Sequence, residues 1–135
     1  MIKVAGLWEL GYSAPLNEHD LWHYMLRAFE VDEWCMSPIS GIRKKVTEYH
    51  SLGTFIDENP DFITVAVDEH GETPLQDFVH PPNALYLTGK AGRSVLALGA
   101  LSVRVENPCK EHGLLWPHQA MAIVLYDRQV KSWQS

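Results

Sequence analysis

A glycine-rich loop in the last third of the chain combines residue types that are well suited to binding a charged ligand. Residues 88–93 hold two glycines, Gly89 and Gly92, and two cations, Lys90 and Arg93. Glycine allows the backbone to approach a ligand closely, and lysine and arginine bind phosphate. The loop lacks the Gly-Lys-Ser/Thr ending of a phosphate loop, and also the third glycine and distal acid of a dinucleotide fingerprint. Taken alone, it predicts a tight turn after a strand.

A second loop, residues 107–115, adds weight to the first. Each loop follows a short apolar run, 83–87 and 102–105 respectively, that is typical of a buried strand. The carboxyl ends of parallel strands meet at one edge of a sheet, where open α/β proteins bind nucleotide-like ligands. We therefore expect the two loops to lie side by side and to form a ligand-binding crevice.

The segment 117–127 completes this pattern as an expected helix that begins at Pro117, because proline favours the first turn of a helix. Its apolar residues cover more than one stripe, and a helix of this kind is buried on most sides. In a chain of 135 residues the extra cover can come from a second copy, so a symmetric homodimer is expected. The alternative is a central helix wrapped by its own chain.

The rest of the chain alternates between apolar runs with strand character and segments with helical spacing. Strands are expected over 2–7, 31–36, 46–49 and 62–67, and helices over 52–58, 74–78 and from the cap Asn17 to Phe29. This alternation predicts an α/β fold with a mostly parallel sheet and helices on both faces. The length indicates a single domain over residues 1–135.

Composition restricts the class of protein further. The formal net charge is −6, which argues against a large phosphate-binding face because affinity for nucleic acid depends on cations near phosphates. No apolar run reaches the roughly 18 residues that a membrane span needs, and residues 1–6 do not resemble a signal peptide. Two separate cysteines, Cys35 and Cys109, predict reduced thiols. We expect a cytoplasmic protein without membrane contact.

The chain has a negative net charge, but it contains one dense basic patch of three consecutive cations, Arg43, Lys44 and Lys45. A run of charges of this kind is usually a solvated loop, and the sharper interpretation is a contact with RNA phosphates. The sequence leaves both interpretations open.

Histidines and cysteines give only weak signals for a metal site. His19 and His23 are four residues apart, so a helix places both on one face, either as a metal pair or as a polar surface. The spacing of Cys109, His112 and His118 fits no common zinc site. No metal is therefore expected.

The order of the elements and several short motifs resemble the SPOUT class of methyltransferases, in particular small single-domain members of the SpoU family. The motifs that carry the resemblance are 6–9, the loop with Pro15, the helix from Asn17, 36–38, 62–67, 70–71, 85–89, 103–105, Leu115 and 120–127. The resemblance implies an α/β sheet with a C-terminal trefoil knot, a homodimer, S-adenosylmethionine as cofactor, and methylation of ribose 2′-hydroxyls of tRNA or rRNA.

The resemblance also implies functional residues. Expected cofactor contacts are Leu87, Thr88, Gly89, Val105, Leu115 and Ala120. His23 stands where the family has an arginine in its first helix, and an imidazole there could accept the hydroxyl proton. Lys90 and Arg93 could hold an RNA phosphate.

Two further positions depart from the family pattern. Ala91 stands where the family has a glutamate, and residues 114–116 replace a Ser-Leu-Asn motif.

Three hypotheses about the function follow. The chain is an active RNA 2′-O-methyltransferase, or a catalytically inactive knotted module that binds S-adenosylmethionine, RNA or a protein, or an unknotted flavodoxin-like domain that binds another phosphate-bearing ligand.

Overall fold

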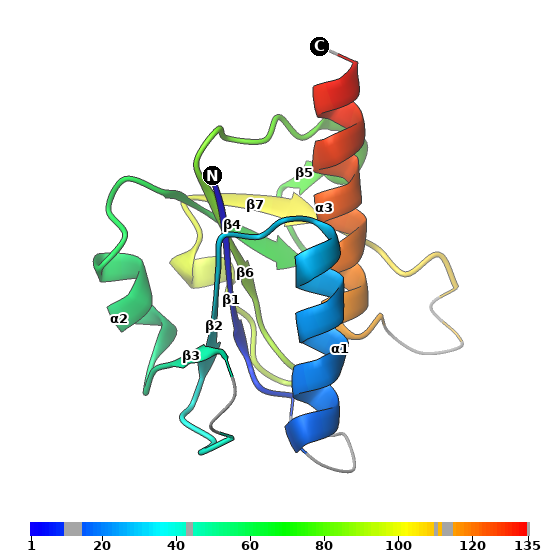
Figure 1. Cartoon of the computed structure of the whole chain (residues 1–135). Coiled ribbons are helices and arrows are strands. Elements are labelled where there is room, and N and C mark those ends of the chain that lie inside the picture. Colours follow the sequence, from blue (N-terminus) through cyan, green and yellow to red (C-terminus); the bar gives the residue numbers. More distant parts are fainter. Residues whose placement is uncertain (10–14, 43–44, 110, 112–114, 135) are drawn as a thin grey trace.

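A parallel sheet forms the centre of the molecule (Figure 1). The computed structural model describes residues 1–9, 15–42, 45–109, 111 and 115–134. The strands are β1 (Ile2–Leu7), β2 (Glu33–Ser37), β3 (Thr47–Glu48), β4 (Ile63–Asp68), β5 (Thr73–Pro74), β6 (Ala84–Thr88) and β7 (Leu101–Arg104). Their order is β3-β2-β1-β6-β4-β7-β5, and each pairing between these strands is parallel.

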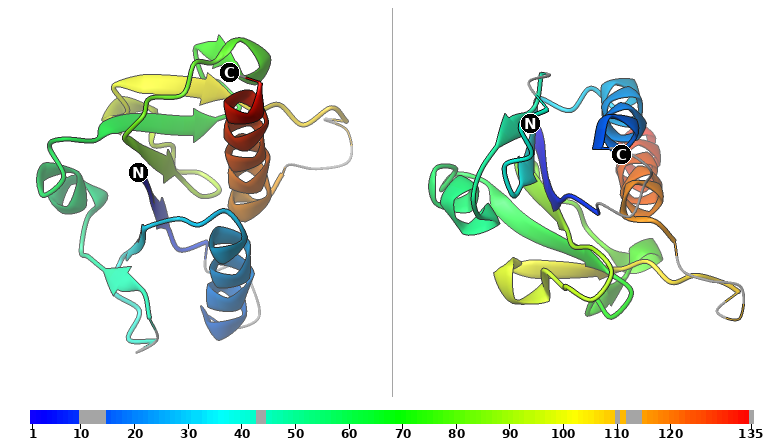
Figure 2. Two further views of the ribbon diagram at one scale, coloured as in Figure 1. Left: turned by 45° about the horizontal axis from the view of Figure 1, so that its top comes forward. Right: turned by 90° about the horizontal axis from the view of Figure 1, so that it is seen from below.

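Helices cover both faces of the sheet. They are α1 (Pro15–Ala28), α2 (Leu52–Asp57) and α3 (Pro117–Trp133), with short 3₁₀ turns η1 (Leu75–Asp77) and η2 (Leu96–Leu98). Helices α1 and α3 lie side by side on one face, and α2 lies on the other (Figures 1 and 2). The predicted α/β fold, with a mostly parallel sheet between helices, is confirmed.

Alternation along the strands divides the core between the two faces. In β1, Val4 packs into the cluster formed with α1 and α3, while Ala5 and Leu7 pack into the cluster formed with α2. This two-residue period is the geometry of a strand buried on both sides. The sequence pattern of uninterrupted apolar runs has the same cause.

Helix α3 is only partly covered by its own chain. Met121, Val124 and Leu125 are buried against the sheet. Ile123 and Tyr126, on another side of the helix, are 41% and 57% exposed. The alternative of a helix fully wrapped by its own chain is therefore wrong.

Several predicted boundaries are corrected. Helix α1 begins at Pro15, so Asn17 lies within its first turn and does not cap it; proline at the start of a helix has its φ already set for helical geometry. Helix α3 continues to Trp133, because residues 128–131 include good helix formers. The expected helix 74–78 is the 3₁₀ turn η1.

Strand β2 begins two residues later than predicted. Glu30 has φ 55°, a left-handed conformation that places the chain in a turn after α1. Asp32 then accepts a hydrogen bond from the Ile2 N–H at 2.7 Å through its carboxylate. The Asp32 N–H also donates to the Ile2 carbonyl at 2.9 Å, so Asp32 is held to the start of β1 just before β2 begins at Glu33.

A mostly buried polar cluster fixes the C-terminal half of α3 to β6 and to the chain before it. This His80 cluster consists of His80, Tyr86, Asp127, Arg128 and Lys131. The imidazole contacts the Tyr86 hydroxyl and the Asp127 carboxylate, each at 2.7 Å. The Arg128 guanidinium donates to the Tyr86 hydroxyl at 3.0 Å, and Lys131 pairs with Asp127 at 2.8 Å.

In the part of the chain that the structure describes, no helix has the length and apolar character needed to cross a membrane.

Candidate cofactor pocket

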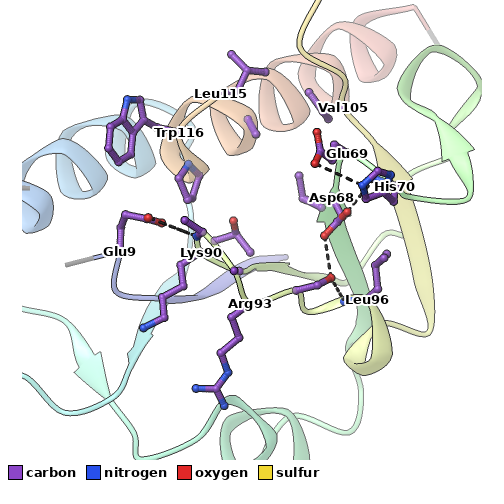
Figure 3. A pocket seen from close by; sticks show the side chains of 18 of the residues that line it. Glu9, Asp68, Glu69, His70, Lys90, Arg93, Leu96, Val105, Leu115 and Trp116 are labelled. Carbon is purple, nitrogen blue, oxygen red and sulfur yellow. Dashed lines mark hydrogen bonds and ion pairs between the residues drawn. The ribbon is translucent and has the colours of Figure 1, made fainter. Parts of the chain in front are cut away.

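The carboxyl ends of the central strands surround a cavity of about 810 Å³ (Figure 3). This volume lies within the roughly 300–1,000 Å³ of typical small-molecule sites. The glycine loop, the segment after β7 and the start of α3 all line it. The predicted ligand-binding crevice between the two C-terminal loops is thus present as a cavity.

The arrangement of the loops needs one correction. Strand β4 lies between β6 and β7, so the two predicted loops are not direct neighbours. The segment after β4 separates them and brings Asp68, Glu69 and His70 to the cavity. Sequence reasoning missed these three residues. The available signal was their position directly after the clearest buried strand.

The glycine loop forms the expected tight turn. The Lys90 N–H donates to the Arg93 carbonyl at 3.0 Å, and the Arg93 N–H donates to the Lys90 carbonyl at 2.9 Å. Gly92 has φ +77°, which favours glycine. A Cβ atom on Gly89 would lie 2.2 Å from the Arg93 carbonyl oxygen. Both glycines are therefore required by the turn itself.

A carboxylate from outside the loop holds this turn. Glu9 follows β1, and its two oxygens accept hydrogen bonds from the Ala91 N–H at 3.3 and 3.2 Å. The Glu9 N–H in turn donates to buried Glu18 at 2.5 Å. A carboxylate thus lies beside position 91, where the resemblance expects a glutamate side chain, but it comes from the end of β1.

The opposite wall of the cavity is largely apolar and comes from the start of α3. Leu115, Trp116, Pro117 and Ala120 line it. Backbone hydrogen bonds fix this helix end, with the Ala120 N–H donating to the Trp116 carbonyl at 3.1 Å. Trp116 is 41% exposed and lines the cavity.

The structure brings most of the predicted cofactor residues to the cavity. Those that line it are Thr88, Gly89, Val105, Leu115 and Ala120. Leu87 is not among the lining residues, because its side chain is fully buried in the core on the α2 face.

The predicted RNA-binding cations divide into two groups. Lys90 and Arg93 line the cavity and extend from the glycine loop (Figure 3). Lys45 is exposed and is not a lining residue. Arg43 and Lys44 lie outside the described residues.

His23 is not among the residues that line the cavity. It lies on α1 and its ring stacks on His19, with centroids 5.5 Å apart.

Burial lowers the pKa of His118, which packs against Trp22. Among the described residues, no group of three His, Cys, Asp or Glu side chains could hold a metal ion.

Comparisons with known proteins identify the fold. No protein-family model matches the sequence, and no curated protein matches it. A Bacillus anthracis protein named as an RNA methyltransferase superposes with a TM-score of 0.70 and 17% identity, over 97% of this chain and 94% of that one. A structure concerned with 2-OH methylation of C/U34 on tRNA gives 0.70 and 15%, over 99% and 98%.

The SpoU methyltransferase AviRb from Streptomyces viridochromogenes, solved with AdoMet, matches with a TM-score of 0.77 and 15% identity. The alignment covers 98% of this chain but only 58% of AviRb, so the chain spans little more than half of that protein. At these identities the likeness concerns the fold. The chain has the fold of the SpoU-type RNA methyltransferases, and the resemblance to the SPOUT class is confirmed at that level.

Proposed function

We propose that the chain is an S-adenosylmethionine-dependent methyltransferase of SpoU type, a single domain over residues 1–135 that acts on ribose 2′-hydroxyls of tRNA or rRNA. The observation that carries this proposal is the cavity at the carboxyl ends of β4, β6 and β7 in a chain with the SpoU fold. Two neighbours support it by their names, since AviRb was solved with AdoMet and another structure concerns tRNA 2-OH methylation.

The lining residues fit this cofactor chemically. Leu96, Val105 and Leu115 offer apolar surface for an adenine ring. The carboxylates of Glu9 and Glu69 offer acceptors for hydroxyl groups and negative charge for a cationic ligand. The cavity therefore combines an apolar wall with a polar wall, as a nucleoside with a charged tail requires.

When bound, S-adenosylmethionine supplies an electrophilic methyl group. The contribution of the chain is mainly to position the reactants, which can account for much of the barrier reduction in such transfers. The turn at Gly89 and the start of α3 fix the two walls of the cavity. Lys90 and Arg93, at the glycine loop, would bind an RNA phosphate next to the reacting ribose.

The hydroxyl proton needs an acceptor, and His23 is the one that we propose. Because His23 does not line the cavity of its own chain, the proposed homodimer has to bring the imidazole to a cavity. The exposed Ile123 and Tyr126 on α3 support such an assembly, since a dimer would cover them.

We also propose a C-terminal trefoil knot, supported by the likeness to SpoU folds. A cytoplasmic location is supported by the free thiols.

Purified protein, labelled S-adenosylmethionine and total tRNA or rRNA test the activity. We expect label on RNA with the wild-type protein, and a loss of about 100-fold in the rate with His23→Ala, because a positioned acid or base contributes about that much. His50→Ala is the matched control, since His50 is exposed and does not line the cavity.

The alternative is a catalytically inactive module with the same fold, and the position of His23 away from the cavity favours it. Calorimetry with S-adenosylmethionine and S-adenosylhomocysteine separates the two functions. Binding without transfer of label to any RNA would contradict catalysis and support the module. Absence of binding would contradict the proposed cofactor in both.

A further inference from the structure

Asp68 lies at the point where the three loops of the cavity meet. It is the last residue of β4, the strand between β6 and β7, and it lines the cavity. Because of this central position, its side chain and its backbone can each reach the loop of a neighbouring strand.

The carboxylate of Asp68 links the loop after β4 to the loop after β6. Its Oδ1 accepts a hydrogen bond from the His70 N–H at 2.8 Å, and its Oδ2 accepts one from the Ser94 hydroxyl at 2.9 Å (Figure 3). The Ser94 Oγ accepts from the Leu96 N–H at 3.1 Å. One side chain therefore fixes the segment after the glycine turn, which leads into η2.

The backbone of Asp68 links the same point to the segment after β7. The Asp68 carbonyl accepts from the Val105 N–H at 3.3 Å and from the Gly71 N–H at 3.2 Å. A Cβ atom on Gly71 would lie 2.3 Å from the Val103 carbonyl carbon, so the turn after β4 packs directly on β7. All three loops are thus connected through one residue.

We infer that Asp68 is a positioning residue whose carboxylate holds the loops after β4 and β6 in the arrangement needed to bind the cofactor. The inference rests on the proposed function for the identity of the ligand. Both carboxylate oxygens already accept hydrogen bonds from the protein. Because these two bonds connect the loops, removal of the carboxylate changes the shape of the site. Amide exchange measured without ligand reports this effect separately from any contact between the carboxylate and the ligand.

Calorimetry with S-adenosylhomocysteine as the probe tests the inference. We expect Asp68→Ala to weaken binding about tenfold, since two charge-assisted hydrogen bonds are lost. Asp68→Asn should recover most of the affinity, because its amide oxygen can accept from His70 and its NH₂ group can donate to Ser94. Asp61→Ala is the matched control, since Asp61 is exposed just before the start of β4 and does not line the cavity.

Amide hydrogen exchange without ligand gives a second, independent measurement. In Asp68→Ala the His70 and Leu96 amides should exchange about fivefold faster, while in Ser94→Ala only the Leu96 amide should do so. If wild-type protein binds no S-adenosylhomocysteine, the proposed function fails, and the exchange rates still decide whether Asp68 orders the loops. Wild-type exchange at both amides in Asp68→Ala, or no recovery by Asp68→Asn, would overturn the inference.

Discussion

The cavity and the His80 cluster both contain charged side chains, yet they use them in opposite ways. In the His80 cluster, imidazole, phenol and carboxylate pair with one another at 2.7 Å. In the cavity, the Lys90 and Arg93 side chains extend from the glycine loop (Figure 3). Groups that pair internally stabilise the fold, whereas groups that border a cavity are available to a ligand. Variants in the two regions should therefore separate stability from binding.

The largest effect is expected for Gly89→Ala. Its Cβ atom would meet the Arg93 carbonyl oxygen at 2.2 Å, so the turn must change its path. Because a misplacement of about 1 Å can cost about 100-fold in the rate of a positioned reaction, methyl transfer should fall by roughly that factor. S-adenosylhomocysteine affinity, measured by calorimetry, should fall as well. Gly53→Ala is the control, since its Cβ atom would approach nothing closer than 3.8 Å. Equal affinity in both variants would refute the role of the turn.

Tyr86→Phe, in the His80 cluster, should lower the stability of the fold and leave cofactor affinity unchanged. It leaves His80 and Arg128 without a buried hydroxyl partner, so the free energy of unfolding should fall by about 1–3 kcal/mol. Urea denaturation measures this loss, and cofactor affinity should be unchanged. Tyr24→Phe, at a side chain that is 70% exposed, is the control. A variant that binds more weakly without losing stability would remove the contrast between the two regions.

The pH dependence of stability should also originate in the His80 cluster. Burial lowers the pKa of His80, and the Asp127 carboxylate offsets this effect only in part. The folded state then binds the proton less readily than the unfolded state, whose histidine titrates near 6.5. Stability is therefore full above about pH 6.5 and is lost as the pH falls through the lower folded pKa.

Urea midpoints between pH 8 and pH 5 check this expectation. His80→Gln should flatten the profile in that range, while His118, whose pKa burial also lowers, accounts for part of the remaining slope. A profile that is identical in wild type and His80→Gln would show that the cluster does not control it.

The smallest effects are expected for the cations of the glycine loop. Lys90→Ala and Arg93→Ala should each lower the salt slope of RNA binding by about one, because each removes one phosphate contact. Neither change should alter the urea midpoint. Lys45→Ala sharpens the comparison, because an unchanged slope indicates a solvated loop and a reduced slope indicates an RNA contact at 43–45.

The sequence predicts the parts of this molecule that depend on local pattern. The apolar run 62–67 forms β4, and the glycine loop forms a turn, because burial and backbone conformation are local properties of these segments. The order of strands is not local, so the placement of β4 between β6 and β7 was missed, and with it Asp68. The His80 cluster was missed for the same reason, since His80 and Asp127 are 47 positions apart.

One helix connects the two regions, and this has a mechanical consequence. Ala120 lines the cavity and Arg128 belongs to the His80 cluster, so at 1.5 Å per residue about 12 Å of rigid α-helix separates them. The contacts of the His80 cluster fix the position of α3 along its axis. They therefore also fix the position of its first turn at the cavity. A displacement of the whole helix would therefore reshape the wall of the cavity. The loss of the Tyr86 hydroxyl alone leaves α3 in place, because Asp127, Arg128 and Lys131 keep their other contacts.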